Sequence, residues 1–170
     1  MNEHQEIDLA IWEACKEGDK NAYAHIYRLY YPRLFNYGCK FTGDAALVED
    51  SIQEIFVRFW ANREKLAAVR ELRSYLFVSF RHYLLKQLSQ QKDQHLDITD
   101  NAFDFVLELS VEQEKMQTEH MQEQAAILHQ ALLQLTQRQK EAIFFRFFEN
   151  MSYEEIADIL NISVKATYKL

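Results

Sequence analysis

The chain of 170 residues contains only three glycines and one proline. Folds with many hairpins need these residues at their turns, so their scarcity excludes a β-sandwich or barrel and favours helices joined by short polar loops. No apolar run reaches the roughly 18 residues needed to span a membrane, and the start does not resemble a secretory signal. Cys15 and Cys39 form no CxxC pair, and we expect them to be buried thiols in a reducing cytoplasm.

Motifs of common enzyme classes are missing as well. There is no Gly-rich phosphate loop, and no histidine follows a glutamate by three residues as in di-iron helical bundles. The six histidines are scattered along the chain. We therefore expect no catalytic site, no metal and no cofactor.

Acidic residues outnumber basic ones, which gives a formal net charge of -7, but the basic residues are concentrated in one block. Residues 62–92 carry seven Lys and Arg against two Asp and Glu, whereas residues 93–135 carry one against nine. A polyanion responds to the charge within about one Debye length, roughly 8–10 Å, and not to the total. An acidic chain can therefore still bind nucleic acid through this block.

Apolar residues recur at helical spacing along most of the chain, which predicts an all-α fold. Between residues 45 and 62, for example, Ile52, Ile55, Phe56 and Phe59 form one stripe at i, i+3, i+4 and i+7. Helices are predicted over residues 6–17, 20–30, 32–41, 45–62, 71–88, 111–134, 137–148, 153–160 and from 164 onward.

Local signals divide the helices into two domains. Three predicted helix starts match the capping box, namely Ser110-x-x-Gln113, Thr136-x-x-Gln139 and Ser152-x-x-Glu155. Residues 89–110 are polar and acidic and have no helical stripe. They are predicted to link a helical domain at 1–88 to a second one at 111–170.

The last twenty residues, MSYEEIADILNISVKATYKL (151–170), predict a helix-turn-helix. Asn161 at the turn tolerates left-handed geometry, and Ser163 can cap the second helix. The second helix of such a motif enters the major groove by its N-terminal end. The residues placed near phosphates or base edges are then Ser163, Lys165, Ala166, Tyr168 and Lys169. An ordinary helical hairpin with a solvated face fits the same pattern.

Two segments resemble conserved regions of bacterial sigma factors. VEDSIQEIFVRFW (48–60) is similar to their second region, and QLTQRQKEAIFFRFFENMSYEEIADILNISVKATYKL (134–170) is similar to their fourth. Their order and spacing resemble the extracytoplasmic-function group, whose members have these two domains and a linker. The resemblance implies a sigma factor that binds core RNA polymerase, opens the minus-ten promoter element and reads the minus-thirty-five element.

The resemblance also implies roles for single residues. Helix 45–62 would lie against the clamp helices of the largest polymerase subunit through Asp50, Gln53, Glu54, Phe56, Arg58 and Trp60, although Phe56 fits the core equally well. The basic block would hold the minus-ten strand, with cations for phosphates and aromatic rings for unstacked bases. Its residues are Arg70, Arg73, Tyr75, Arg81, His82 and Lys86. Solvated surface arginines would leave the same pattern.

Further expectations follow from the same resemblance. The linker would thread through the polymerase cleft, although a solvated tether fits the sequence equally well. An anti-sigma factor is an implied partner, in this family often anchored in the membrane. The family's reading helix normally continues for several turns, so we expect this chain to be truncated within it at Leu170.

Two other classes of protein fit parts of the sequence. One is a non-sigma helix-turn-helix regulator whose first 92 residues sense a signal or dimerise. The other is a helical adaptor that binds only protein. Binding to core RNA polymerase separates a sigma factor from the first class, and DNA binding separates both from the second.

Overall fold

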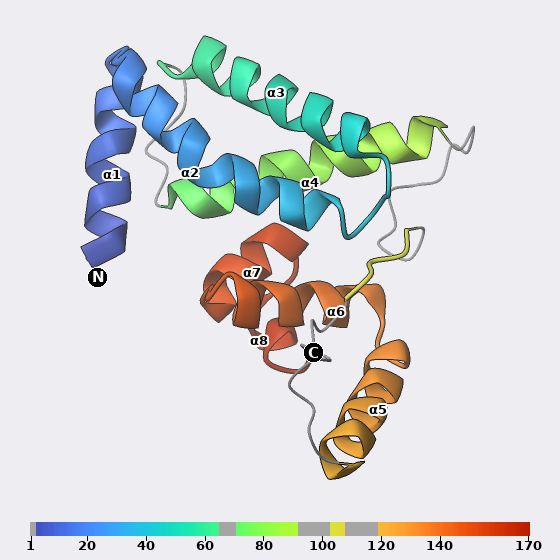
Figure 1. Ribbon diagram of the computed structural model, residues 1–170. Helices are drawn as coiled ribbons and strands as arrows, with labels where there is room; N and C mark the ends of the chain where they lie inside the picture. The colour runs from blue at the N-terminus through green and yellow to red at the C-terminus, as the bar shows by residue number, and fades with distance from the viewer. Residues whose placement is uncertain (1–2, 65–70, 92–102, 108–118) are drawn as a thin grey trace.

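The computed structural model describes residues 3–64, 71–91, 103–107 and 119–170, and these ranges contain helices and no β-strand (Figure 1). The predicted all-α class is confirmed. The first part of the chain forms α1 (Glu3–Lys16), α2 (Lys20–Gly38), α3 (Ala45–Asn62) and α4 (Leu72–Gln91). The second part forms α5 (Glu119–Leu133), α6 (Gln137–Ile143), the π-helix η2 (Phe144–Phe148), α7 (Tyr153–Leu160) and α8 (Val164–Thr167). None of the helices in these ranges is long and apolar enough to cross a membrane.

Helix α3 shows how the first four helices form a bundle. Its predicted apolar stripe is buried, with Ile52 and Phe59 at most 1% exposed, and the helix packs against α2 and α4. Helices α2 and α3 lie close together at Gly38, the last residue of α2. A Cβ atom there would lie 2.7 Å from Val48 Cγ1, so this position requires a residue without a side chain.

The prediction of two separate helices over residues 20–30 and 32–41 is wrong, because α2 runs without interruption from Lys20 to Gly38 and contains Pro32. Proline inside a helix removes one backbone hydrogen bond and costs about 3 kcal/mol. The flanking residues Tyr30 and Leu34 are fully buried. Their burial against the rest of the bundle offsets the local cost, which a short sequence window cannot reveal.

The helix starts and the turn of the C-terminal part follow the predicted local chemistry. Thr136 and Gln139 form a reciprocal capping box at the start of α6, and Ser152 and Glu155 form another at the start of α7. In the second box the Ser152 N–H donates to Glu155 Oε2 at 2.8 Å. Asn161 ends α7 in the left-handed region with φ of 51°, which gives the predicted helix-turn-helix its turn.

Two predicted helices differ in detail from those in the structure. Regular helix was predicted over residues 137–148, but the last turn widens into η2, where the Glu149 N–H donates to the Phe144 carbonyl at 3.3 Å. The chain leaves this turn through Asn150, whose φ is 50°. Of the helix predicted over 111–134, the structure describes α5, and the predicted capping box at Ser110 lies outside the described residues.

The two predicted helical domains are packed against each other. Figure 1 shows α6, α7 and α8 below the bundle of α1–α4, and α7 packs against α4. Tyr37 of α2 is fully buried at this junction. Its ring centroid lies 5.6 Å from that of Phe144 and 4.8 Å from that of Phe145. The domains therefore share an aromatic core, and this contact decides how the predicted site residues are placed.

Candidate nucleic-acid interface

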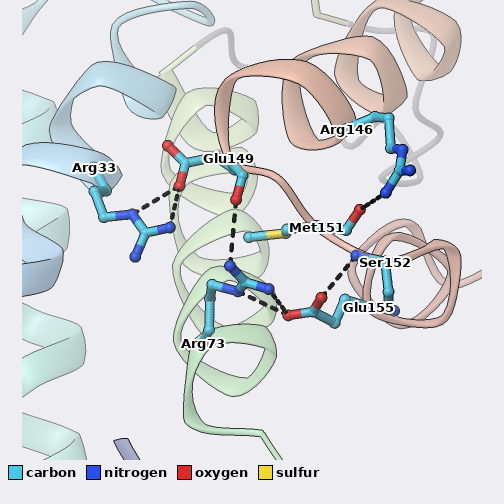
Figure 2. Close-up of polar contacts among 7 residues, drawn as sticks. All are labelled: Arg33, Arg73, Arg146, Glu149, Met151, Ser152 and Glu155. Carbon is cyan, nitrogen blue, oxygen red and sulfur yellow. Dashed lines mark hydrogen bonds and ion pairs between the residues drawn. The ribbon is translucent and has the colours of Figure 1, made fainter. Parts of the chain in front are cut away.

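Arg73 was predicted to hold DNA, but in this structure it reaches across to α7 (Figure 2). Its Nε donates to Glu155 Oε1 at 2.7 Å, and its Nη2 contacts the same oxygen. Its Nη1 donates to the Glu149 carbonyl at 3.2 Å. Because Glu155 also accepts from the Ser152 N–H in the α7 cap, the carboxylate is fixed by its own helix. Arg73 therefore binds a preformed acceptor in the other domain.

Arg81 lies two turns further along α4 and is buried, with 4% of its surface exposed. Its Nε donates to Glu141 Oε2 at 2.9 Å and its Nη2 to Glu141 Oε1 at 3.1 Å, which makes a two-pronged pair. The Tyr37 hydroxyl donates to the same carboxylate at 2.7 Å. The pKa of Tyr37 is raised well above its usual value, mainly by burial and secondly by the negative charge of Glu141. The hydroxyl thus stays protonated and acts as a donor.

A third arginine crosses the junction at a position that sequence reasoning missed. The Nε and Nη2 atoms of Arg33, in α2, each lie 2.7 Å from Glu149 Oε2. Figure 2 shows this pair beside Arg73. The carboxylate side chain is 6% exposed. The two residues are 116 positions apart, so no local pattern in the sequence could have paired them.

The remaining predicted residues of the basic block have different surroundings. His82 and Lys86 are exposed and lie one turn apart on α4. Tyr75 is half-buried, and its ring centroid lies 6.3 Å from that of Phe59. Arg70 lies outside the described residues. The structure thus leaves the side chains of His82 and Lys86 at the surface, whereas Arg73 and Arg81 point into the domain junction.

The helix-turn-helix places its predicted residues largely at the surface. Ser163 caps α8 by accepting from the Ala166 N–H at 3.1 Å, while buried Thr167 fixes the helix on the domain. Lys165, Tyr168 and Lys169 are exposed, and Ala166 is half-buried. The Tyr168 ring lies against the ring of Tyr153 in α7, with centroids 4.2 Å apart and the ring planes tilted by 33°.

The polymerase surface predicted on α3 has an exposed polar face. Asp50 and Gln53 are exposed, as expected. Phe56, in contrast, is 1% exposed and packs within the bundle, so it supports the helix and does not face a partner. Val57 was missed, although it lies one turn after Gln53; it is 61% exposed and extends the same face.

The other predicted residues of this surface are held by neighbouring side chains. Glu54 pairs with Arg58 at 2.6 Å, and the Arg58 guanidinium lies 5.0 Å from the centroid of the Tyr83 ring. Trp60 is half-buried, with its ring 4.8 Å from that of Tyr23. These contacts fix the orientation of the side chains along the helix.

Helix α4 extends to Gln91, into the predicted linker, and residues 103–107 of that linker are packed between the domains. Phe103, Phe105 and Leu107 are each less than 8% exposed, and the Val106 N–H donates to the Lys40 carbonyl at 2.8 Å. The alternation of apolar residues at every second position is typical of an extended segment with one buried face. That pattern was available in the sequence but lay within an acidic stretch.

Carboxylates gather beside Arg73 where α4 begins. Glu71, Glu155 and Asp158 border a pocket of about 490 Å³ between α4 and α7. Burial, a hydrogen bond with Glu155 and the charges of Glu155 and Asp158 raise the pKa of Glu71 to about 7, against the opposing charge of Arg73. Burial raises the pKa of Glu155 too, but hydrogen bonds from Arg73 and Ser152 outweigh it and lower the value overall. Within the described ranges no group of three His, Cys, Asp or Glu is placed to bind a metal.

Comparison with known sequence families gives two matches. The family described as Sigma-70 region 2 matches residues 26–94, and the one described as Sigma-70, region 4 matches residues 125–170. The two matches together cover more than half of the chain. They occur in the order predicted from the two motifs.

Individual relatives agree with these matches. The ECF RNA polymerase sigma factor SigW of Bacillus subtilis (strain 168) is 23% identical over 157 residues, which cover 88% of this chain and 82% of the relative. The RNA polymerase sigma factor YlaC of the same organism is 24% identical over 139 residues, covering 82% and 79%. Among solved structures, that of CnrH in complex with the cytosolic domain of CnrY has a TM-score of 0.58. It is 18% identical and covers 95% of this chain and 88% of its own, and it shows a common fold.

Proposed function

The chain belongs to the extracytoplasmic-function group of sigma factors in the sigma-70 family, and from this we propose that it binds core RNA polymerase and directs it to particular promoters in the cytoplasm. In this proposal the N-terminal domain binds the polymerase clamp and opens the minus-ten element. The helix-turn-helix of the C-terminal domain reads the minus-thirty-five element. The protein is a transcription initiation factor, and the polymerase supplies the catalysis.

The distribution of polar side chains over the N-terminal domain carries the proposal. Asp50 and Gln53 are exposed on α3, which lies on the side of the bundle away from α6–α8 (Figure 1). Arg73 and Arg81 point from α4 toward the opposite side, where the C-terminal domain is packed. With a protein-binding and a cationic surface on different sides, one domain can hold polymerase and DNA together.

Both candidate DNA surfaces have chemistry suited to their targets. Along α4, cationic side chains accompany the half-buried ring of Tyr75, which suits a strand whose bases are unstacked. On α8, the exposed side chains of Lys165 and Lys169 follow the Ser163 cap, which suits duplex phosphates and base edges.

Transcription in vitro tests the proposal. The full chain is added to core RNA polymerase and a library of promoter fragments, and the transcripts are sequenced from their 5′ ends. We expect transcripts that depend on the chain and share two upstream elements. Binding to core polymerase without such transcripts would contradict promoter recognition. DNA binding without polymerase binding would support the alternative of a non-sigma regulator, and protein binding alone would support an adaptor.

The predicted polymerase surface has its own variant and control. Asp50→Ala with Gln53→Ala removes two exposed polar groups from α3, so we expect weaker binding to core polymerase with unchanged unfolding. Glu13→Gln is the control, because it also removes an exposed carboxylate, one that pairs with Lys16 at 2.7 Å on α1. If the double variant and the control bind core polymerase equally well, the polymerase interface does not include Asp50 and Gln53.

We also propose an anti-sigma protein, anchored in the membrane, as a second partner. The structurally similar CnrH has been solved in complex with the cytosolic domain of CnrY, which supports a comparable complex here. Fractionation of cells that produce this chain tests the idea. We expect part of the chain to sediment with membranes and to be released by protease treatment of their cytoplasmic face, and a chain found only in the soluble fraction would contradict it.

A further inference from the structure

The pocket between α4 and α7 is bordered on one side by a single face of α4 and by Glu71, which precedes that helix. The Tyr75 N–H donates to the Glu71 carbonyl at 3.2 Å, so Glu71 continues the helical spacing. The residues on this face recur at i, i+3, i+4, i+7 and i+8, namely Glu71, Ser74, Tyr75, Val78 and Ser79. The volume of about 490 Å³ is typical of a small-molecule site and far exceeds that of one water molecule.

Helix α7 gives the pocket an acidic wall. Glu154, Glu155 and Asp158 border it. Glu155 is paired with Arg73, whereas in the described part of the chain Glu154 and Asp158 form no ion pair. Glu154 and Asp158 lie one turn apart, and like charges at this spacing slightly destabilise a helix. The pocket therefore carries more negative charge than the arginine offsets.

A buried hydroxyl group lies in the wall that α4 contributes. Ser74 borders the pocket and is 7% exposed. Its Oγ is buried and has no hydrogen-bond partner among the described residues. A buried polar atom without a protein partner is unfavourable, and such atoms usually contact a water, an ion or a ligand. A molecule that donates N–H groups inside the pocket would satisfy this oxygen.

Glu71 shows that the negative charge of the pocket is already costly. Burial, a hydrogen bond with Glu155 and the charges of Glu155 and Asp158 raise the pKa of Glu71 to about 7, against the opposing charge of Arg73. Near neutral pH a proton therefore offsets part of the negative charge. A bound cation can replace this proton, because a positive charge close to a carboxylate favours its ionised form.

We propose that this pocket binds a small aliphatic diamine. Its two ammonium groups contact the carboxylates of Glu71 and Asp158. Its alkyl chain lies against the side chains of Tyr75 and Val78. Each ammonium group has three N–H donors, which leaves one for Ser74 Oγ. The inference does not rest on the proposed function, because neither DNA nor polymerase takes part in the binding.

A diamine fits this site better than a metal ion or a single ammonium group. Within the described ranges no three of the carboxylates are placed to bind one metal ion. Besides Glu155, which Arg73 neutralises, three carboxylates border the pocket, so two positive charges match it better than one. Aliphatic amines have pKa values near 10 and are charged at neutral pH.

Three variants test the three kinds of contact. Glu71→Gln and Asp158→Asn each keep the size of the side chain and remove one negative charge. Ser74→Ala removes the buried hydroxyl, and because that hydroxyl has no protein partner, the melting temperature should stay the same or rise. Glu17→Gln is the control, since it removes an equal charge at an exposed position next to α1, outside the pocket.

The experiment is isothermal titration calorimetry on the full chain with 1,4-diaminobutane at neutral pH. An ionic strength of roughly 0.15 M screens exposed charges beyond about 8 Å. Three further titrants are compared: n-butylamine, whose single ammonium group also represents a lysine side chain, the uncharged 1,4-butanediol, and magnesium chloride. Circular dichroism checks that each variant keeps its helices.

We expect one diamine to bind per chain, about tenfold or more tightly than n-butylamine, because a hydrogen bond to a charged group is typically worth that factor or more. The diol should not bind. Glu71→Gln and Asp158→Asn should each weaken the binding of the diamine about tenfold or more. Ser74→Ala should weaken it about two- to tenfold, and Glu17→Gln should leave it unchanged.

Proton release gives a second readout that a general loss of structure would not produce. Because the pKa of Glu71 is about 7, about half of the molecules carry this proton at pH 7, and a bound diamine should expel it. Titration in buffers of different ionisation enthalpy should then show the release of about half a proton per diamine. Glu71→Gln should show none.

Four results would overturn the inference. The diamine could give no binding heat, which would leave a pocket that holds only water. Magnesium ions or n-butylamine could bind as tightly as the diamine, which would indicate a metal site or a site for a lysine side chain. Glu17→Gln could weaken binding as much as the pocket variants, which would indicate general attraction to an acidic protein. A failure of the proposed function would instead appear as a chain that does not bind core polymerase.

Discussion

Phe105 of the linker should control the closed arrangement of the two domains. Its side chain is 1% exposed, and its ring lies 5.0 Å from Phe41 and 5.8 Å from Tyr37 in one domain, and 5.8 Å from Phe144 in the other. Replacing a buried phenylalanine by alanine costs about 3–5 kcal/mol. Because the ring belongs to neither helical domain, the cost should fall on closure. The ratio of closed to open molecules should then drop by roughly two to nearly four powers of ten.

Small-angle X-ray scattering and urea unfolding measure how far the contact between the two domains is weakened. Phe105→Ala should raise the radius of gyration of the free chain and split one unfolding transition into two, because the domains no longer stabilise each other. Val106→Ala is the control, since this neighbouring side chain is 49% exposed. A compact Phe105→Ala chain with a single transition at the midpoint of the control would refute the assignment of Phe105 to the domain contact.

Two further predictions concern packing and pH. Gly38→Ala should lower the stability by about 1–3 kcal/mol, because its Cβ would lie 2.7 Å from Val48 Cγ1; an unchanged or higher melting temperature would contradict this. The pKa of Glu71 is raised to about 7 by burial and by Glu155, so the closed form binds a proton more tightly than the open form. The contact between the two domains should therefore weaken as the pH rises from about 5 to about 7.5, and the radius of gyration should grow. Glu71→Gln should abolish this change. A pH response that persists in Glu71→Gln would point to another group.

The features that were predictable from the sequence depend on residues near one another in the chain. The stripe of α3, the cap at Ser152 and the left-handed Asn161 each follow from a few neighbouring side chains, and the structure has all three. A capping box satisfies backbone donors within one turn, so its chemistry is complete in a four-residue window. The exposed face of Asp50 and Gln53 follows from helical spacing in the same way.

What could not be predicted depends on the contact between the domains. Arg73 and Arg81 were predicted to hold DNA, but in the structure they bind Glu155 and Glu141, which lie 82 and 60 positions away. Such pairings are fixed by tertiary packing and leave no periodic signal. The division of α2 into helices at 20–30 and 32–41 was wrong for a related reason, since burial of Tyr30 and Leu34 keeps the helix continuous through Pro32.

The dual role of Arg73 can be tested by the salt dependence of promoter binding. Holoenzyme made with Arg73→Ala and bound to a pre-melted promoter should lose one phosphate contact, which lowers the slope of log affinity against log salt by about 0.7–0.9. The same variant, free of polymerase, should be more extended than the unmodified chain. An unchanged slope would show that Arg73 serves only the contact between the domains and would contradict its assignment to DNA.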